Sequence, residues 1–208
     1  MMDQNDLKYY GEYTDIIADG KNRILSEINK ILDSIAEDSE QFPVEHIRSR
    51  IKSHESMKEK LRKKGFSDDI KTGLKVLSDI IGVRIITHFI GDVYLIFELL
   101  KKSSYWEIVK VKDYISYPKA NGYRSLHVIL RIPVECSDFE FIMAEIQLRT
   151  VAMDCWASLE HQMKYKKNIK NTELIVSELK RCADEIASTD LSMQTIREML
   201  QNNKEEDR

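Results

Sequence analysis

The sequence predicts an α+β fold, in which a mixed β-sheet of about five strands is flanked by helices. Two observations support this prediction. Apolar residues recur at a nearly helical period in several segments, and the shorter apolar or alternating runs between them have the length and β-branching of strands. At 208 residues the chain is long enough to bury a sizeable core. We therefore expect a single domain over residues 1–208, with helices at both ends.

The first predicted elements are helical and are followed by a strand. Isoleucines recur at a nearly helical spacing over about residues 5–38, which predicts one or two helices that end before Pro43. Residues 46–52 alternate strictly between polar and apolar side chains, as in a strand with two different faces. Ser53 is a suitable N-cap for a helix over about 54–64.

This strand and helix carry a concentration of positive charge. Residues 46–64 contain eight lysines and arginines against two glutamates. The alternation places four polar side chains on one strand face: His46, Arg48, Arg50 and Lys52. Counted from Lys52, three helix residues continue this surface at i+4, i+8 and i+11: Ser56, Lys60 and Lys63. Such a charge run is usually only a solvated face, but it becomes a phosphate cradle if the strand and the helix converge.

The remaining chain alternates between the two kinds of element. Further helices are predicted over about 68–78, 91–102, 150–163 and 172–202, the last ending in a polar tail. Further strands are predicted over about 80–86, 105–113, 124–133 and 140–149, and the last of these places Glu145, Gln147 and Arg149 on one face. We expect Trp106, Trp156 and the methionines in the core. The histidines at 46, 54, 88 and 161 are expected at the surface or in packing rather than as ligands.

Composition limits the classes of function. A net charge of −3 gives no global attraction to nucleic acid or to an anionic membrane. Cys136, Cys155 and Cys182 lie far apart, which argues against a disulfide framework or a zinc site. The N-terminus has no signal-peptide pattern, and no run approaches the roughly 18 apolar residues of a membrane span. We therefore expect a cytoplasmic protein without membrane contact.

Residues 112–127 combine a turn signal with side chains suited to a nucleotide. Asn121-Gly122 is the strongest short-range signal for a β-hairpin. A bare hairpin, however, does not need the cations and rings that surround this dipeptide, a set suited to stacking a base and holding phosphates: Lys112, Lys119, Tyr123 and His127. Spacing alone leaves a nucleotide site and a decorated turn equally open.

Two carboxylates next to predicted strands are candidate metal ligands. Taken singly, Asp79 and Glu145 are as consistent with a helix cap or an ion pair as with function. Brought to one sheet edge beside phosphate-binding lysines, the two would form a Mg²⁺ site, because Mg²⁺ is typically held by one or two carboxylates and substrate phosphates. Arg84, five residues past Asp79, could offer a bidentate fork to the same phosphates.

Four segments, in order along the chain, resemble the synthetase motifs of the RelA/SpoT alarmone enzymes. These segments are Arg50-Ile-Lys52-Ser53, Asp79-Ile-Ile-Gly82-Val-Arg84, residues 113–127 and Glu145-Ile-Gln147-Leu-Arg149-Thr150. The resemblance covers about residues 45–166, including the helix that contains Trp156-Ala-Ser-Leu-Glu-His161. The chain lacks the His-Asp signature of the hydrolase domain, so it is similar to the small, single-domain alarmone synthetases.

The resemblance implies a nucleotidyltransferase-like fold, a homotetramer, and transfer of pyrophosphate from ATP to the ribose 3′-hydroxyl of GDP or GTP, with release of AMP. It implies that ATP is held by Arg50, Lys52, Ser56, Lys60, Lys63 and Arg84, although Lys63 stands where the family is expected to have an arginine. Asp79 and Glu145 would bind Mg²⁺, and Glu145 would also be the base for the 3′-hydroxyl. Tyr123 would stack on guanine. The acceptor's phosphates and sugar would be held by Lys112, Lys119, Asn121 and His127.

Two other functions are weighed, one from the same broad fold and one from a different class. A template-independent nucleotidyltransferase commonly carries Gly-Ser followed by paired aspartates, whereas Ser78 precedes Asp79 with neither the glycine nor a second aspartate two residues on. A catalytically silent nucleotide sensor would be expected to have lost one carboxylate, yet both are present. The sequence therefore favours the enzyme.

Overall fold

The computed structural model describes residues 3–36, 42–164 and 172–206. Its centre is one five-stranded sheet in the order β1-β2-β5-β4-β3. The parallel pairing of β2 with β5 and the antiparallel pairing of the other neighbours confirm the predicted mixed sheet. The strands are β1 (Val44–Ile51), β2 (Ile81–Thr87), β3 (Glu107–Asp113), β4 (Leu126–Pro133) and β5 (Phe141–Thr150).

The described helices follow the predicted order. They are α1 (Gln4–Tyr10), the short 3₁₀ helix η1 (Gly11–Tyr13), α2 (Thr14–Ala36), α3 (His54–Lys63), α4 (Ile70–Val76), α5 (Ile90–Leu100), α6 (Val151–Lys164) and α7 (Thr172–Glu206). Positions 37–38 of the first predicted helix and 165–166 of the predicted motif region lie outside the described residues. The predicted end of the last helix at 202 is wrong, since α7 continues to Glu206 through charged residues that favour helix.

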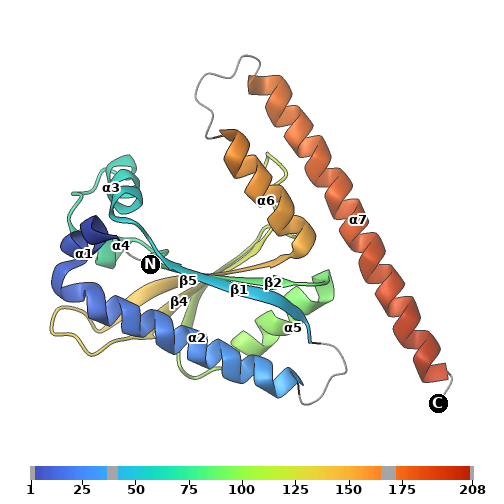
Figure 1. Cartoon of the computed structure of the whole chain (residues 1–208), viewed down its shortest axis with the longest axis horizontal. Coiled ribbons are helices and arrows are strands. Elements are labelled where there is room, and N and C mark those ends of the chain that lie inside the picture. The colour runs from blue at the N-terminus through green and yellow to red at the C-terminus, as the bar shows by residue number, and fades with distance from the viewer. Residues whose placement is uncertain (1–2, 37–41, 165–171, 207–208) are drawn as a thin grey trace.

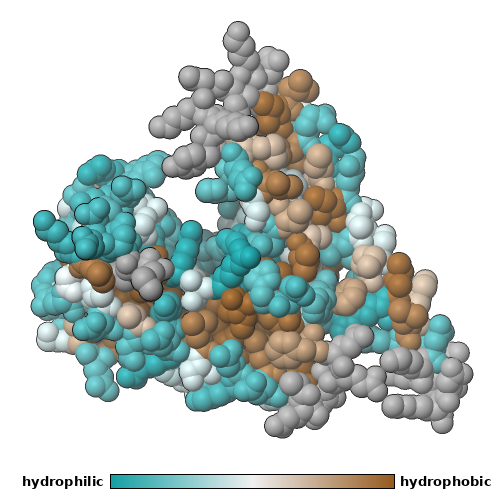
Figure 2. Space-filling view, viewed as in Figure 1, coloured by the Kyte–Doolittle hydropathy of each residue, from teal (hydrophilic) through white to brown (hydrophobic). Residues whose placement is uncertain are grey.

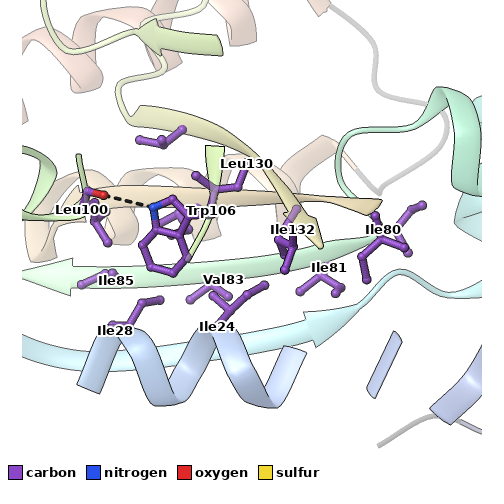
Figure 3. Close-up of a cluster of buried hydrophobic side chains, with 14 of the residues drawn as sticks. Ile24, Ile28, Ile80, Ile81, Val83, Ile85, Leu100, Trp106, Leu130 and Ile132 are labelled. Atoms are coloured by element: carbon purple, nitrogen blue, oxygen red, sulfur yellow. Dashed lines mark hydrogen bonds between the residues drawn. The ribbon is translucent and has the colours of Figure 1, made fainter. Parts of the chain in front are cut away.

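Helices α2 and α5 cover one face of the sheet, and the main core lies between this face and the two helices (Figure 1). Figure 3 shows Ile24 and Ile28 of α2 packed against Val83 and Ile85 of β2, all fully or almost fully buried. Trp106 closes this cluster and donates its indole N–H to the carbonyl oxygen of Leu100 at 3.0 Å. The prediction that Trp106 is in the core is therefore confirmed.

A smaller core joins α6 to α7. Trp156 is buried there, as predicted, and its indole N–H donates to the carbonyl oxygen of Leu179 at 2.9 Å. The expectation that the methionines are core residues is wrong for Met163, Met193 and Met199, which are exposed. These three lie on α6 and α7, where only one side of the helix pair packs against the domain, as Figure 1 shows for most of the length of α7.

The second face of the sheet is left for polar residues. Helices α3 and α6 rise on that side at opposite ends of the sheet (Figure 1). Within residues 3–36, 42–164 and 172–206, no helix combines the length and the apolar sequence that a membrane crossing requires.

Candidate functional site

The register of the sheet aligns polar residues from four strands on the face opposite the main core. Arg48 pairs with Arg84, Arg84 with Gln147, and Gln147 with His127, so these residues form one row across β1, β2, β5 and β4. A parallel row joins Arg50, Gly82 and Glu145. Since alternate residues of a strand share a face, both rows project from the same side of the sheet. The predicted polar face of the first strand is thus continued by three more strands.

A cavity of about 290 Å³ lies over these rows. Both candidate metal ligands, Asp79 and Glu145, line it together with the arginines at positions 48, 50 and 84 and with Gln147. Hydrophilic side chains rim the hollow of the surface between α3 and α6 in Figure 2. The structure therefore brings the two carboxylates into one basic cavity.

Asp79 is held by two lysines from the predicted phosphate cradle. Its Oδ2 lies 2.9 Å from Nζ of Lys52 and 2.8 Å from Nζ of Lys60, so the strand and the helix do converge. Burial opposes ionisation of Asp79, but the hydrogen bonds and charges of the two lysines outweigh it and hold the pKa of this carboxyl below its usual value. The other oxygen, Oδ1, is buried and has no hydrogen-bond partner among the described residues. A cation is the kind of partner that such an oxygen lacks.

Glu145 is bound through both of its carboxylate oxygens. Oε1 lies 3.1 Å from Nδ1 of His127, and Oε2 accepts the side-chain N–H of Gln147 at 2.7 Å. Burial raises the pKa of Glu145, yet the hydrogen bond and charge of His127, together with Gln147, bring it below the usual value for a glutamate. The side chain is therefore an ionised carboxylate at neutral pH.

Of the other residues assigned to ATP, some line the cavity and others do not. Arg50 and Arg84 line the cavity, and Arg84 is further tied to Asp154 at 3.1 Å. Ser56 lies in the first turn of α3, where its hydroxyl accepts from the N-cap Ser53 at 2.9 Å. Lys63 is not brought to the cluster. Its side chain is largely exposed and pairs with Glu59 at 2.6 Å, one helical turn back.

The loop between β3 and β4 is a hairpin, as the Asn-Gly signal predicts. The amide N–H of Gly122 donates to the carbonyl oxygen of Lys119 at 2.8 Å, and that of Lys119 donates to Tyr123 at 3.2 Å. The Tyr123 ring is half-buried, with Nζ of Lys119 4.8 Å from its centroid and the rings of Tyr114 and His127 edge-on to it. The residues assigned to the acceptor thus gather round this ring.

Two further acceptor-site residues sit at the border of the loop. Asn121 donates its side-chain N–H to Glu160 of α6 at 2.9 Å. Lys112 is half-buried and lies opposite His127 in the register of β3 and β4. Asn121 therefore lies in the same turn as Tyr123, and Lys112 lies beside His127 on the neighbouring strand.

Helix α7 fixes the position of this loop, and nothing in the sequence pattern indicated it. Arg124 donates to the carbonyl oxygens of Gly122 and Ala183 at 3.2 and 3.3 Å, and it binds Asp184 at 3.3 Å. Gly122 has φ +88°, and a Cβ on it would lie 2.5 Å from the Cβ of Ala183. Only glycine allows both this backbone and this close approach.

Gly122→Ala should therefore destabilise the loop between β3 and β4. The strained φ alone costs about 1–3 kcal/mol, and the clash with Ala183 adds to it. Gly65→Ala is the matched control, because Gly65 has φ +76° with nothing within 4 Å of the added Cβ. Urea unfolding should give the larger loss of unfolding free energy for Gly122→Ala. Equal losses for both variants would mean that contact with α7 is unimportant.

Comparisons with known proteins agree with the geometry. A model of the region found in RelA/SpoT proteins matches residues 49–170. GTP pyrophosphokinase YwaC of Bacillus subtilis (strain 168) is 49% identical over 143 residues, which cover 68% of this chain and 68% of that protein. GTP pyrophosphokinase YjbM of the same organism is 32% identical over 166 residues, covering 79% and 77%.

Solved structures show the same likeness. Small alarmone synthetase 1 from Bacillus subtilis, bound to its product pppGpp, superposes with a TM-score of 0.82 at 27% identity, over 93% of this chain and 99% of that one. Small alarmone synthetase 2 from the same organism gives a TM-score of 0.75 at 41% identity, over 86% and 92%. The predicted fold class is confirmed by these similarities.

Proposed function

This chain belongs to the RelA/SpoT family, and on that premise we propose that it is a GTP pyrophosphokinase of the small alarmone synthetase kind. It transfers pyrophosphate from ATP to the 3′-hydroxyl of GDP or GTP and releases AMP. The observation that carries this conclusion is the cavity lined by Asp79, Glu145, Arg50 and Arg84, in which His127 connects Glu145 to Tyr123 of the β3–β4 loop. Its substrates are cytoplasmic nucleotides, so we place the enzyme in the cytoplasm.

The donor side of the site binds and orients the ATP phosphates. Arg50 and Arg84 offer planar forks to them, while Lys52 and Lys60 supply point charges beside Asp79. Ser56 would bind ATP from the first turn of α3. Lys63 would have to turn away from Glu59 to join them.

Mg²⁺ fits the carboxylate pair. The unpartnered Oδ1 of Asp79 and the carboxylate of Glu145 line the same cavity, and hard oxygen ligands of this kind suit Mg²⁺. When bound, Mg²⁺ would neutralise charge on the transferring phosphates.

The acceptor side presents the 3′-hydroxyl to Glu145. Tyr123 would stack on guanine, and Lys112, Lys119, Asn121 and His127 would hold the sugar and phosphates. Glu145, already ionised, takes the hydroxyl proton as the oxygen attacks the β-phosphorus of ATP. The bond to the bridging oxygen of the α-phosphate breaks and AMP leaves. Such transfers depend mainly on positioning and charge stabilisation, so no covalent nucleophile is required.

The direct test is incubation of the protein with ATP, GDP and Mg²⁺, followed by chromatographic separation of the nucleotides. We expect AMP and a guanosine 3′-pyrophosphate product in equal amounts. A parallel reaction with GTP measures acceptor preference. Release of AMP without a new guanine nucleotide, or no consumption of GDP, would contradict the proposal.

We also propose that the protein assembles into a homotetramer through α7. Of the helices at the two ends of the described chain, α2 buries Ile17, Ile24 and Ile28 in the main core. Helix α7 instead keeps an exposed apolar stripe, and Figure 2 shows brown patches along this helix. The stripe consists of Met193, Ile196, Met199 and Leu200. An exposed stripe of this kind marks an interaction surface.

Light scattering at micromolar concentration should give about four times the chain mass of 24.4 kDa. Ile196→Asp should lower this mass because it places a charge in the apolar stripe, whereas Ile196→Val should leave it unchanged. A mass of about 24 kDa for the unmodified protein would exclude the assembly.

A further inference from the structure

Five side chains of the site form a closed ring of hydrogen bonds. Nη2 of Arg149 donates to the hydroxyl oxygen of Tyr123 at 2.6 Å and to Oε1 of Gln147 at 3.0 Å. The Tyr123 hydroxyl contacts Nε2 of His127 at 2.8 Å, and Nδ1 of His127 contacts Oε1 of Glu145 at 3.1 Å. Gln147 closes the ring on the other oxygen of Glu145 at 2.7 Å. Arg149 therefore reaches both oxygens of the carboxylate, each through a separate arm.

The chemistry of the partners sets the direction of each hydrogen bond. An ionised carboxylate only accepts, so Nδ1 of His127 and the amide N–H of Gln147 both donate to Glu145. If the imidazole is neutral, Nε2 then accepts the hydroxyl proton of Tyr123; if it is charged, Nε2 donates to the hydroxyl oxygen instead. The guanidinium of Arg149 only donates, so it fixes the orientation of the Gln147 amide and of the Tyr123 hydroxyl. In either state His127 and Gln147 both donate to Glu145, and Arg149 donates to Tyr123 and Gln147 behind them.

Arg149 is itself immobilised by its surroundings. Its side chain is 5% exposed. Nε donates to Oγ of Ser125 at 3.3 Å, and Nη1 donates to Oδ1 of Asp154 at 3.0 Å. The same Asp154 oxygen binds Arg84 at 3.1 Å. A chain of contacts thus connects the donor-side cation Arg84 with the carboxylate on the acceptor side.

We propose that Arg149 is a positioning residue, which holds the Glu145 carboxylate in the orientation that removes the 3′-hydroxyl proton. This inference rests on the proposed function, because it gives Arg149 a part in that reaction. Asp154 extends the role to the donor side by binding Arg149 and Arg84 at once. The reactive oxygen of Glu145 and the phosphate-binding fork of Arg84 are thereby kept in register.

The geometry requires arginine and not merely a positive charge. A single guanidinium serves Tyr123, Gln147 and Asp154 in fixed directions, which an ammonium at the end of a flexible stem does not reproduce. A misplacement of about 1 Å in a reacting group costs about 100-fold in rate. We therefore expect Arg149→Lys to lower kcat by about 100-fold, with the KM for ATP and for GDP changed only a few-fold.

The test is steady-state kinetics of the full chain with ATP, GDP and Mg²⁺, with melting temperatures recorded alongside. Arg131→Lys is the matched control. It makes the same exchange on the neighbouring strand β4, where Arg131 pairs with Glu107 at 2.7 Å outside the ring. Arg131→Lys should keep the kcat of the unmodified protein. If the unmodified protein makes no guanosine product, the proposed function fails; if it does and Arg149→Lys retains its kcat, only the present inference fails.

The two arms provide a test that leaves Arg149 in place. Tyr123→Phe removes one arm and Gln147→Leu the other, and each should lower kcat with little change in melting temperature. If Arg149 acts on Glu145 through these two arms, adding either change to Arg149→Lys should lower kcat little further. The effects of residues that work as a unit are not additive. Additive losses of kcat would overturn the proposal. So would a normal kcat in the variant that combines Tyr123→Phe with Gln147→Leu.

Discussion

Glu145→Gln should abolish pyrophosphate transfer while the fold stays cooperative. A positioned base alone contributes about 100- to 10,000-fold to such a rate, and the change also removes charge beside the proposed cation. The volume of the side chain is kept, and the glutamine oxygen still accepts from His127 or from Gln147. Turnover with ATP, GDP and Mg²⁺ measures the loss, and thermal unfolding checks the fold. Glu140→Gln is the matched control, because Glu140 is exposed and immediately precedes β5, the strand that contains Glu145.

Asp79→Asn should give a loss of the same order for a different reason. An asparagine still accepts from Lys52 and Lys60, but it brings no negative charge to the cavity. Asp33→Asn makes the same change at an exposed position of α2 and should leave turnover unchanged. Near-normal rates in Mg²⁺ for either site variant would exclude that carboxylate from the catalytic centre.

Tyr123→Ala should weaken binding of guanine nucleotides by about 5- to 150-fold, since a base–aromatic stack is worth about 1–3 kcal/mol. ATP affinity should hardly change. Tyr123→Phe should keep GDP affinity within a few-fold because it retains the ring, even though kcat falls through loss of the hydroxyl. Tyr117→Ala is the control, since that ring belongs to the same loop and is 80% exposed. Calorimetry with each nucleotide separates these effects.

Tyr123 also packs against the small core around Trp156, so the melting temperature must be recorded with the affinities. Equal losses of ATP and GDP affinity, together with a large drop in melting temperature, would mean that the ring is structural. The acceptor base would then have to bind elsewhere on the loop.

Periodicity and motif order were sufficient to predict the sheet and most of the helices. The alternation from His46 to Lys52 predicted a polar strand face, and the pairing register places that face over the cavity. The same alternation put Glu145, Gln147 and Arg149 on one side of a strand. That pattern was the available signal for Arg149. It did not show that Tyr123 of the β3–β4 loop and His127 of β4 would lie beside it.

Other features depend on contacts between distant parts of the chain, which periodicity does not contain. Lys63 has the helical spacing expected of a phosphate-binding residue. In the structure it does not line the cavity, and it forms an ion pair with Glu59. The methionines of α7 are of a residue type that is usually buried, but Met193 and Met199 are exposed because they do not pack against the rest of the domain. The support of the Tyr123 loop by α7 joins residues 59 positions apart.

That last contact has a consequence for how the protein is made. The four motifs emerge from the ribosome before Ala183 and Asp184. The nascent chain therefore contains all four motifs while its β3–β4 loop still lacks the helix that Gly122 and Arg124 contact. A product that stops short of α7 would contain all four motifs, but its β3–β4 loop would lack these contacts, so on the proposed function we expect it to bind guanine nucleotides poorly. Under the proposed function, binding of the acceptor nucleotide therefore depends on α7, a segment that is synthesised after all four motifs.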